Sequence, residues 1–266
     1  MGGTIPPVTP STPSGSDLVT LGILTKPISE FSNSDIGTTV LIPYNDPTGK
    51  ILLNDGKIEF EVVGVNHHTT TEYPKTITLM TKNIIRLAAF DAEEPYNELY
   101  DDEYGGFGRM TCGNNRWSVS NIRQWLNSSG AANSWFTAQH DYDEAPTSDK
   151  VSGADGAYAN APGFLAGFSA NVLQHFTDIT NTTALCSLDG GGSETTFDKV
   201  FLPSYTEMSG NQNNGIAEGA HLFIRYPDDE SRLKNSANGI YWMRSPANNN
   251  SFSVWRIYYD YQRCRQ

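Results

Sequence analysis

Apolar and polar residues alternate along the first third of the chain, which is the pattern of strands that bury one face. After the turn signature Asn54-Asp55-Gly56, the segment KIEFEVV places its apolar side chains on one side and its glutamates on the other. The same alternation recurs in TITLMT, and the β-branched run TTVLIP ends at Pro43. An Asp-Gly turn between such runs favours a hairpin. We therefore predict three antiparallel strands with one buried face.

The middle of the chain changes to a helical period. Within residues 117–130, Val119, Ile122, Trp125 and Leu126 recur at helical spacing, with Ser118 as the expected cap and Gly130 as the expected stop. We also predict a short helix from about Asn133, which carries Trp135, and a third helix within residues 162–176. The tryptophans of these segments are expected in the core.

Strand patterns return after a polar loop at residues 181–196. They are expected at 198–208, at 221–227 and in the terminal stretch. Strands, then helices, then strands separated by long loops predict an α+β fold. Residues 1–16 are rich in Gly, Pro, Ser and Thr and are expected to be a disordered arm or linker. Residues 17–266 are expected to form a single domain.

Charge and composition exclude several classes of partner. The net charge of −12 argues against non-specific binding to nucleic acid or to anionic membranes. No segment approaches the ~20 apolar residues of a membrane span, so no membrane insertion is expected. The N-terminus lacks the basic and apolar regions of a signal peptide. Cys112, Cys186 and Cys264 have no metal-type spacing, which favours a reducing compartment, although one long-range disulfide is an open alternative.

The terminal stretch from Gly239 to Gln266 concentrates tryptophan, tyrosine, arginine and three successive asparagines. Rigid aromatics and adaptable polar groups are typical of recognition surfaces. The alternative is a pair of sheet strands whose aromatics fill a core, and both interpretations are open for Tyr241 and Trp242. From Trp255 to Arg263, polar and aromatic residues occupy both alternate faces of a strand, which favours the surface.

The chain carries no recognised catalytic or cofactor-binding motif. His67 and His68 follow a strand, where adjacent side chains point to opposite faces, so we do not expect them to share a metal. The cluster from His140 to Glu144 lacks a second group of ligands, and the acidic segment 91–116 lacks the spacing of a calcium loop. We therefore expect no catalytic residue, no metal and no cofactor.

Four segments together carry a resemblance to a known family: WSVSNIRQWLNSS, PGFLAGF, DKVFLPSYTEM and YWMRSP. In this order they resemble a widespread family with a W-L-R-S-P motif, found in bacterial surface proteins and in phage and prophage tail-associated proteins. The resemblance covers about residues 34–260. It implies no known catalytic activity, so the chain is not expected to be an enzyme.

The W-x-R-S-P region and the polar, tyrosine-rich end also resemble the variable proteins of diversity-generating retroelements. That resemblance implies a C-type-lectin-like fold, related to the formylglycine-generating enzyme, with twisted antiparallel sheets, two to three helices and long loops. It implies that Trp242, Arg244 and Pro246 form a scaffold. The ligand-contacting positions that it implies are Asn248, Asn249, Asn250, Phe252, Trp255, Tyr258, Tyr259, Tyr261 and Arg263.

The function implied is binding of a host or cell-surface protein or glycan, in a phage tail or on a bacterial surface. One alternative is a structural module of a tail or surface assembly. A formylglycine-generating-type enzyme is the other, but the cysteines do not match its paired thiols. The E-P-N and W-N-D triplets of sugar-binding C-type lectins are absent, so calcium-dependent sugar binding is not implied. Related chains continue to a further strand after the position where this sequence stops.

Overall fold

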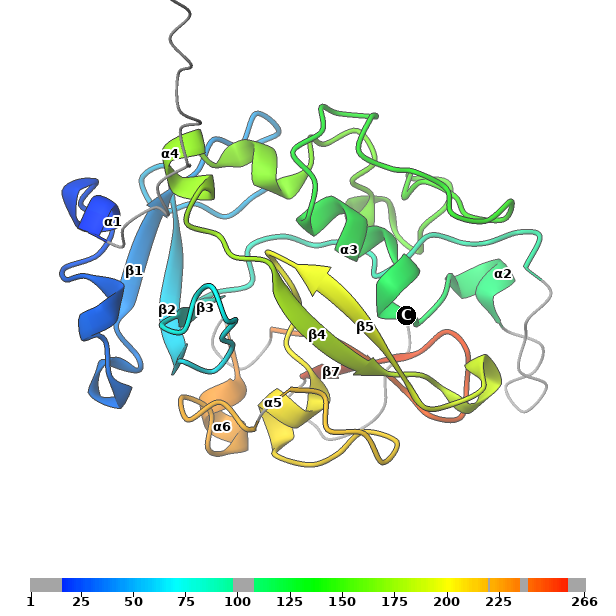
Figure 1. The fold of residues 1–266 in the computed structure, drawn as a ribbon. Helices are drawn as coiled ribbons and strands as arrows, with labels where there is room; N and C mark the ends of the chain where they lie inside the picture. The colour runs from blue at the N-terminus through cyan, green and yellow to red at the C-terminus, as the bar shows by residue number, and fades with distance from the viewer. Residues whose placement is uncertain (1–15, 98–107, 220, 235–238, 258–266) are drawn as a thin grey trace, which may run out of the picture.

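The computed structural model describes residues 16–97, 108–219, 221–234 and 239–257, and Figure 1 shows their arrangement. The architecture is mixed α/β, with small antiparallel sheets and short helices joined by long loops. The coarse fold class predicted from the sequence is therefore confirmed. No helix among the described residues is long and apolar enough to cross a bilayer. The expected arm lies outside the described residues except for its last position, and the domain division stays a prediction.

The N-terminal sheet has the strand order β1-β2-β3 and is antiparallel throughout. Val40 lies opposite Phe60, and Ile42 lies opposite Ile58, so the apolar positions share one buried face. The turn before β2 has positive φ at Asp55 and Gly56, which the Asp-Gly turn chemistry allows. All three predicted strands are confirmed: β1 (Thr39–Pro43), β2 (Lys57–Val65) and β3 (Ile77–Thr81).

The second face of β2 is also covered in its last half. Val63 is fully buried, and the carboxylate of Glu61 is buried against three partners from residues 225–234. Arg225 Nε donates to Glu61 at 2.8 Å, and the hydroxyl of Tyr226 donates to the same carboxylate. The prediction of a single buried face is therefore wrong for this half of the strand, because a distant loop packs on the other side.

Two further hairpins complete the described sheets. The first joins β4 (Ile179–Ala184) to β5 (Ser193–Asp198), and the second joins β6 (Tyr241–Pro246) to β7 (Val254–Ile257). The expectation of a flexible loop at 181–196 is wrong. Its threonines and asparagine suit a strand because the inward-facing Asn181 and Thr183 are buried in a polar interior rather than an apolar one.

The helices are short, and most are single turns. Six α-helices occur among the described residues: α1 (Ser16–Thr20), α2 (Arg109–Cys112), α3 (Asn121–Leu126), α4 (Ala170–Leu173), α5 (Tyr205–Ser209) and α6 (Asp229–Arg232). The 3₁₀ turns include η1 (Ile28–Glu30), η2 (Asn33–Asp35), η4 (Trp117–Val119), η5 (Ala154–Gly156), η6 (Phe164–Gly167) and η7 (Ser187–Asp189). In the view of Figure 1, α3 and α4 lie above β4 and β5, and α5 and α6 lie below them.

None of the three predicted helices forms over the predicted residues. The first is divided into η4 and α3, and its cap is Ser120 rather than Ser118. No helix begins at Asn133, which has a left-handed φ of 60° in a turn. The third is interrupted between η6 and α4 because the carbonyl of Gly167 accepts a hydrogen bond from Asn45 N instead of from its own helix.

The strands predicted at 198–208 and 221–227 do not form. β5 ends at Asp198, and the next regular element is α5, which begins with a capping box in which Ser204 and Glu207 bond each other's backbone N–H. This S-x-x-E signature is present in the sequence and decides against a strand there. Residues 221–227 have no strand partner among the described residues, although Phe223 and Tyr226 are buried.

The larger core lies between the N-terminal sheet and the segments around α3 and η6, and it is rich in aromatics. Trp135 stacks on Tyr158 with centroids 5.6 Å apart, and Trp125 contacts Tyr158 and Phe164 edge-on or tilted. Each indole N–H is satisfied by a main-chain carbonyl, which removes the cost of burying it. The prediction that these tryptophans are core residues is confirmed.

A buried carboxylate ties this core to the β4–β5 hairpin. Asp198 is fully buried and accepts hydrogen bonds from Trp117 Nε1 at 3.0 Å and Arg123 Nε at 2.7 Å. It also accepts from Asn181 Nδ2 at 3.0 Å and Thr196 Oγ1 at 2.6 Å. One carboxylate thus fixes α3 and η4 against both strands.

A smaller core contains a second buried charge, the ion pair between Glu207 of α5 and Arg244 of β6. Their side chains are both fully buried, and Arg244 Nη1 lies 2.7 Å from Glu207 Oε2. Burial alone raises the pKa of the Glu207 carboxyl, but Arg244 and neighbouring histidines outweigh it and hold the pKa well below its usual range. Arg244 also donates to the carbonyls of Leu202 and Glu218. The pair therefore joins β6 to α5 and to the loops at Leu202 and Glu218.

Removing the cation is expected to be costly. R244M leaves the Glu207 carboxylate buried without its guanidinium, so the free energy of unfolding should fall by about 3–5 kcal/mol in urea denaturation. The control is K199M, which removes the more exposed pair of Lys199 and Asp178 and should cost less than about 1 kcal/mol. Equal effects of the two substitutions would contradict the central role of the buried pair.

Candidate functional site

The strongest candidate for a recognition site is the loop between β6 and β7, residues 247–253, which we call the C-terminal loop. The side chain of Asn250 and one main-chain hydrogen bond close it. The Oδ1 of Asn250 accepts from Ser253 N at 2.6 Å and from Phe252 N at 3.2 Å, and Ala247 N donates to Ser253 O at 2.8 Å. Asparagine suits such a turn because its short amide satisfies main-chain groups two and three residues ahead.

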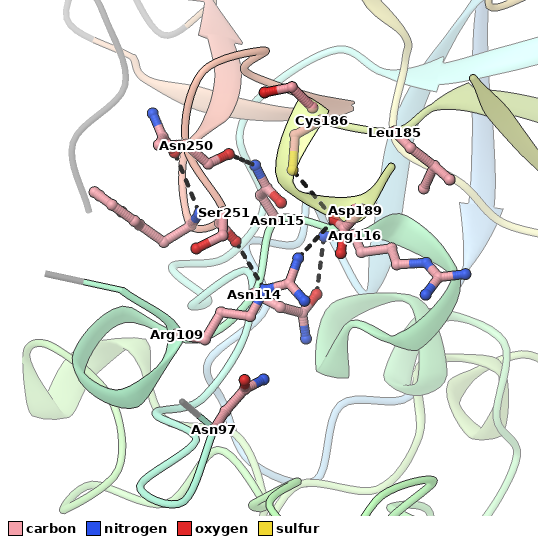
Figure 2. Close-up of polar contacts among 12 residues, drawn as sticks. Asn97, Arg109, Asn114, Asn115, Arg116, Leu185, Cys186, Asp189, Asn250 and Ser251 are labelled. Atoms are coloured by element: carbon pink, nitrogen blue, oxygen red, sulfur yellow. Dashed lines mark hydrogen bonds and ion pairs between the residues drawn. The ribbon is translucent and has the colours of Figure 1, made fainter. Parts of the chain in front are cut away.

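A buried asparagine anchors the loop from the segment before η4. Asn115 is fully buried, and its Nδ2 donates to the carbonyls of Asn250 and Ser253, both at 2.9 Å. Its main-chain N donates to Ser251 O at 3.1 Å, and Arg109 Nε donates to the same oxygen at 3.0 Å. Figure 2 shows these side chains converging on the loop. The main-chain path of the loop is thereby fixed.

A second anchor comes from η7, beyond β4. The main-chain N and the hydroxyl of Ser187 donate to Asn248 O at 3.0 and 2.9 Å. Asp189, two residues later, pairs with Arg109 at 2.6 Å in a nearly buried contact (Figure 2). The two anchoring segments are therefore held to each other as well as to the loop.

A buried polar cluster beneath Arg109 and Asn115 fixes their positions. Asn114 donates from Nδ2 to Asp91 at 2.6 Å and to Glu94 at 2.8 Å, and Asn97 donates to Glu94. Asn121 N donates to Asp91 at 2.9 Å. Burial and the neighbouring Glu94 raise the pKa of Asp91 well above its usual value, and burial also raises the pKa of Glu94. These acids serve as structural acceptors for the asparagine framework.

The residues predicted to contact a ligand differ in their exposure in the structure. Asn248 and Asn249 are exposed at the tip of the C-terminal loop. Asn250 and Phe252 are buried, because the amide of Asn250 closes the turn and the Phe252 ring is enclosed. Their side chains therefore belong to the framework of the loop, and their assignment to the contact surface stays a prediction. Four further predicted positions lie outside the described residues: Tyr258, Tyr259, Tyr261 and Arg263.

Trp255 is half-buried and belongs partly to the smaller core. Its ring centroid lies 4.8 Å from that of Tyr205, and its Nε1 donates to Asn213 Oδ1 at 3.1 Å. Asn213 also donates to the carbonyl of Pro246 at 3.1 Å. These contacts use most of the indole, so replacement of Trp255 by alanine would disturb packing as well as any ligand contact.

The residues expected to form a scaffold are engaged in main-chain and ionic contacts. Trp242 Nε1 donates to Ala88 O at 3.0 Å, and its ring packs against the larger core. Arg244 and Pro246 are buried. The scaffold residues and the loop thus follow one another along a single hairpin.

Sequence reasoning missed the anchors of the loop and one group of possible metal ligands. Nothing local in the sequence indicates that Asn115 and Ser187 reach a loop more than 60 residues later. The expectation that His67 and His68 diverge is wrong, because β2 ends at Val65 and Asn66 has a left-handed φ of 54°. Ligand atoms of both histidines and of Glu207 lie within 4.8 Å of one another.

The described cysteines are free thiols in environments that disfavour the thiolate. Burial, with Asp189 beside it, raises the pKa of Cys186 to about 11, and its Sγ donates to Asp189 Oδ2 at 3.2 Å. Burial also raises the pKa of Cys112. Because the thiolate is the reactive form, neither environment is that of an activated nucleophile.

Comparison with known proteins gives one match. A family model described as a domain of unknown function, DUF6273, matches residues 75–265, which is more than half of the chain. The matched region includes both anchors and the C-terminal loop, whereas β1 and β2 precede it. No curated protein and no solved structure is significantly similar to the chain.

The anchoring of the C-terminal loop can be tested with a nearly isosteric substitution. N115D turns two donated hydrogen bonds into contacts between acceptors, removes the side-chain donor from the carbonyl of Asn250, and leaves the carbonyl of Ser253 with Ala247 N beside a repelling carboxylate. The free energy of unfolding should fall by about 3 kcal/mol in urea denaturation. N171D makes the same chemical change at an exposed asparagine and should change it by less than about 0.5 kcal/mol. A stable N115D protein would show that Asn115 does not hold the loop.

Proposed function

The chain belongs to the DUF6273 family, and we propose that it is a binding protein whose contact surface is built around the C-terminal loop. One observation carries the proposal: the loop is held through its main-chain carbonyls while the side chains of Asn248 and Asn249 are exposed. Carbonyls of Asn248, Asn250, Ser251 and Ser253 accept the anchoring hydrogen bonds. These anchoring bonds go to main-chain oxygens of the loop, so they do not depend on which side chain stands at position 248.

Such a loop meets a ligand at low entropic cost. Ordering a mobile loop costs binding free energy, and a loop already fixed in the free protein avoids that cost. Amide side chains both donate and accept, which lets them adapt to different partner groups. Exposed apolar side chains, Leu188 of η7 and Met110 of α2, belong to the two anchoring segments. The resulting surface combines polar tips with apolar contact area.

This composition favours a protein partner over a glycan. Apolar area beside adaptable amides is typical of protein recognition. The proposed partner is a host or cell-surface protein, and the proposed setting is a phage tail or a bacterial surface. We further propose that the domain is C-type-lectin-like and a target of a diversity-generating retroelement. The short sheets, the long hydrogen-bonded loops and the exposed loop of the terminal hairpin support that assignment.

The first test compares sister genes. If the chain is a retroelement target, differences among close relatives should concentrate at 247–266, beside a reverse transcriptase gene. The structure adds a sharper expectation: within the C-terminal loop, the exposed positions 248 and 249 should vary more than the buried Asn250, whose amide closes the turn. Differences spread evenly along the chain would instead support a structural module of a tail or surface assembly.

The second test measures binding directly. Fluorescently labelled protein is applied to a panel of intact bacterial cells and read by flow cytometry. N248R/N249R places two bulky cations at the loop tip and should weaken binding by at least about 10-fold, since disrupting a central contact costs more than about 1.4 kcal/mol. Mild protease treatment of the cells should abolish binding, and periodate oxidation of their glycans should not.

The matched control for this experiment is N160R/N171R, which adds the same charge at exposed asparagines elsewhere. It should bind as the unmodified protein does. If N248R/N249R also binds unchanged, the contact surface is not the C-terminal loop. If periodate rather than protease abolishes binding, the partner is a glycan.

A further inference from the structure

Three of the five histidines of the chain gather beside one buried carboxylate, at a place unrelated to the C-terminal loop. His68 Nε2 donates to Glu207 Oε1 at 2.9 Å, and His67 Nε2 lies 3.6 Å from the same oxygen. The ring centroids of His67 and His221 are 4.5 Å apart. Residues separated by about 140 positions in the sequence thus present imidazole and carboxylate groups to one point.

The backbone after β2 is shaped to bring the adjacent histidines together. The register of β2 against β3 shifts between Val62 and Gly64, and Asn66 then adopts a left-handed φ of 54°. A Cβ on Gly64 would lie 2.7 Å from His67 Cβ, so only glycine lets the His67 side chain cross over the strand at this point. Bulges of this kind commonly redirect side chains at functional sites.

Hydrogen bonds also fix the position of the Glu207 carboxylate. Glu207 Oε2 is used by the capping box, where Ser204 N donates at 2.8 Å, and by Arg244 at 2.7 Å. The other oxygen, Oε1, is the one that faces the histidines. Gly219 has a φ of 114°, and a Cβ there would lie 2.9 Å from that oxygen. Two oxygens of one carboxylate thus have separate tasks.

His67 supplies the observation that points to a ligand. Its side chain is only 2% exposed, and its Nε2 has no hydrogen-bond partner. The ring is enclosed by Phe223 and His221, with centroids 4.5 Å away in both cases. A buried polar atom without a partner destabilises the fold, so an unsatisfied nitrogen beside a carboxylate and a second imidazole calls for an atom that binds all three.

The second histidine has an outer contact of the kind that metal-ligating histidines have. Nδ1 of His68 lies 3.3 Å from Thr78 Oγ1 on β3, which can fix the ring while Nε2 stays directed at the cluster. Metal-bound imidazoles commonly use the other ring nitrogen for such a contact. His68 also borders a cavity of about 440 Å³ whose walls are mostly apolar, including Leu79, Val200 and Phe201.

We propose that His67, His68 and Glu207 bind a divalent transition-metal ion of the zinc class. The ligand atoms are Nε2 of each histidine and Oε1 of the glutamate. Two imidazoles and one carboxylate form a known three-ligand set for zinc, which leaves a further position for water or another donor. His221 is exposed and packs on His67, so it is a candidate for that position. This inference is independent of the proposed binding function of the C-terminal loop.

The charge balance selects among metals. Arg244 already neutralises much of the Glu207 charge, so the site offers little net negative charge and mostly nitrogen ligands. Magnesium and calcium prefer several oxygen ligands, whereas imidazole suits zinc, copper, nickel and cobalt. The site should therefore bind zinc or cobalt and not respond to magnesium.

The experiment uses the full chain after chelator treatment and dialysis. Titration with Co²⁺, followed by its visible absorption, and with Zn²⁺ by calorimetry should each give one equivalent bound. Zn²⁺ should raise the melting temperature and Mg²⁺ should not, because only a ligand of the folded state stabilises it. H67Q and H68Q should each weaken zinc binding by at least about 100-fold, since loss of an outer partner alone costs about 10–100-fold.

The matched control is H140Q, the same change at a histidine outside the cluster, which should bind as the unmodified protein does. Failure of the unmodified protein to bind either ion, or equal binding by H67Q, H68Q and H140Q, would overturn the proposal. If a variant does not fold, the X-ray absorption spectrum of the zinc-loaded unmodified protein decides without substitution. Two or three imidazole ligands support the site, and none or one overturns it.

Discussion

The buried pair of Glu207 and Arg244 is the constraint on which the second half of the fold depends. Both side chains are inaccessible to water, where an unpaired charge would be severely destabilising. The pair is tolerated because each partner has further hydrogen bonds: Glu207 to Ser204 N and His68, and Arg244 to two carbonyls. α5, β6, the turn after β2 and the loop at Glu218 are therefore positioned by one another.

The segments that carried the family resemblance supply buried polar connectors as well as apolar core residues. In the first segment, Arg123 reaches Asp198, and Asn127 bonds the main chain at Lys199 and Val200. The S-x-x-E motif forms the capping box of α5, and the R-S of the terminal motif bonds Glu207 and Glu218. A protein with many loops buries main-chain groups that no helix or strand satisfies, and these groups need side-chain hydrogen bonds. The polar residues of these motifs provide such bonds.

Sequence patterns predicted the parts of the fold that depend on local periodicity. The strands β1, β2 and β3 and the core tryptophans follow from alternation and helical spacing. The polar strands β4 and β5 escaped prediction because their buried face is lined by Asn181 and Thr183, which look like loop residues. In the candidate site, Asn248 and Asn249 were named through the resemblance to retroelement variable proteins, and their role in ligand contact stays a proposal. The anchor Asn115 was not predictable, because the contact depends on chain crossings that no local pattern encodes.

Glu207 and Arg244 lie far apart in the sequence, and this separation matters while the chain is being synthesised on the ribosome. The carboxylate is made 37 residues before the guanidinium that neutralises it. Until β6 emerges, Glu207 must stay hydrated, so the smaller core cannot close around it. Because translation proceeds from the N-terminus, this core cannot be completed until β6 has been synthesised. The larger core draws most of its residues from segments that precede Glu207, with Val254 and Trp242 added by the terminal hairpin.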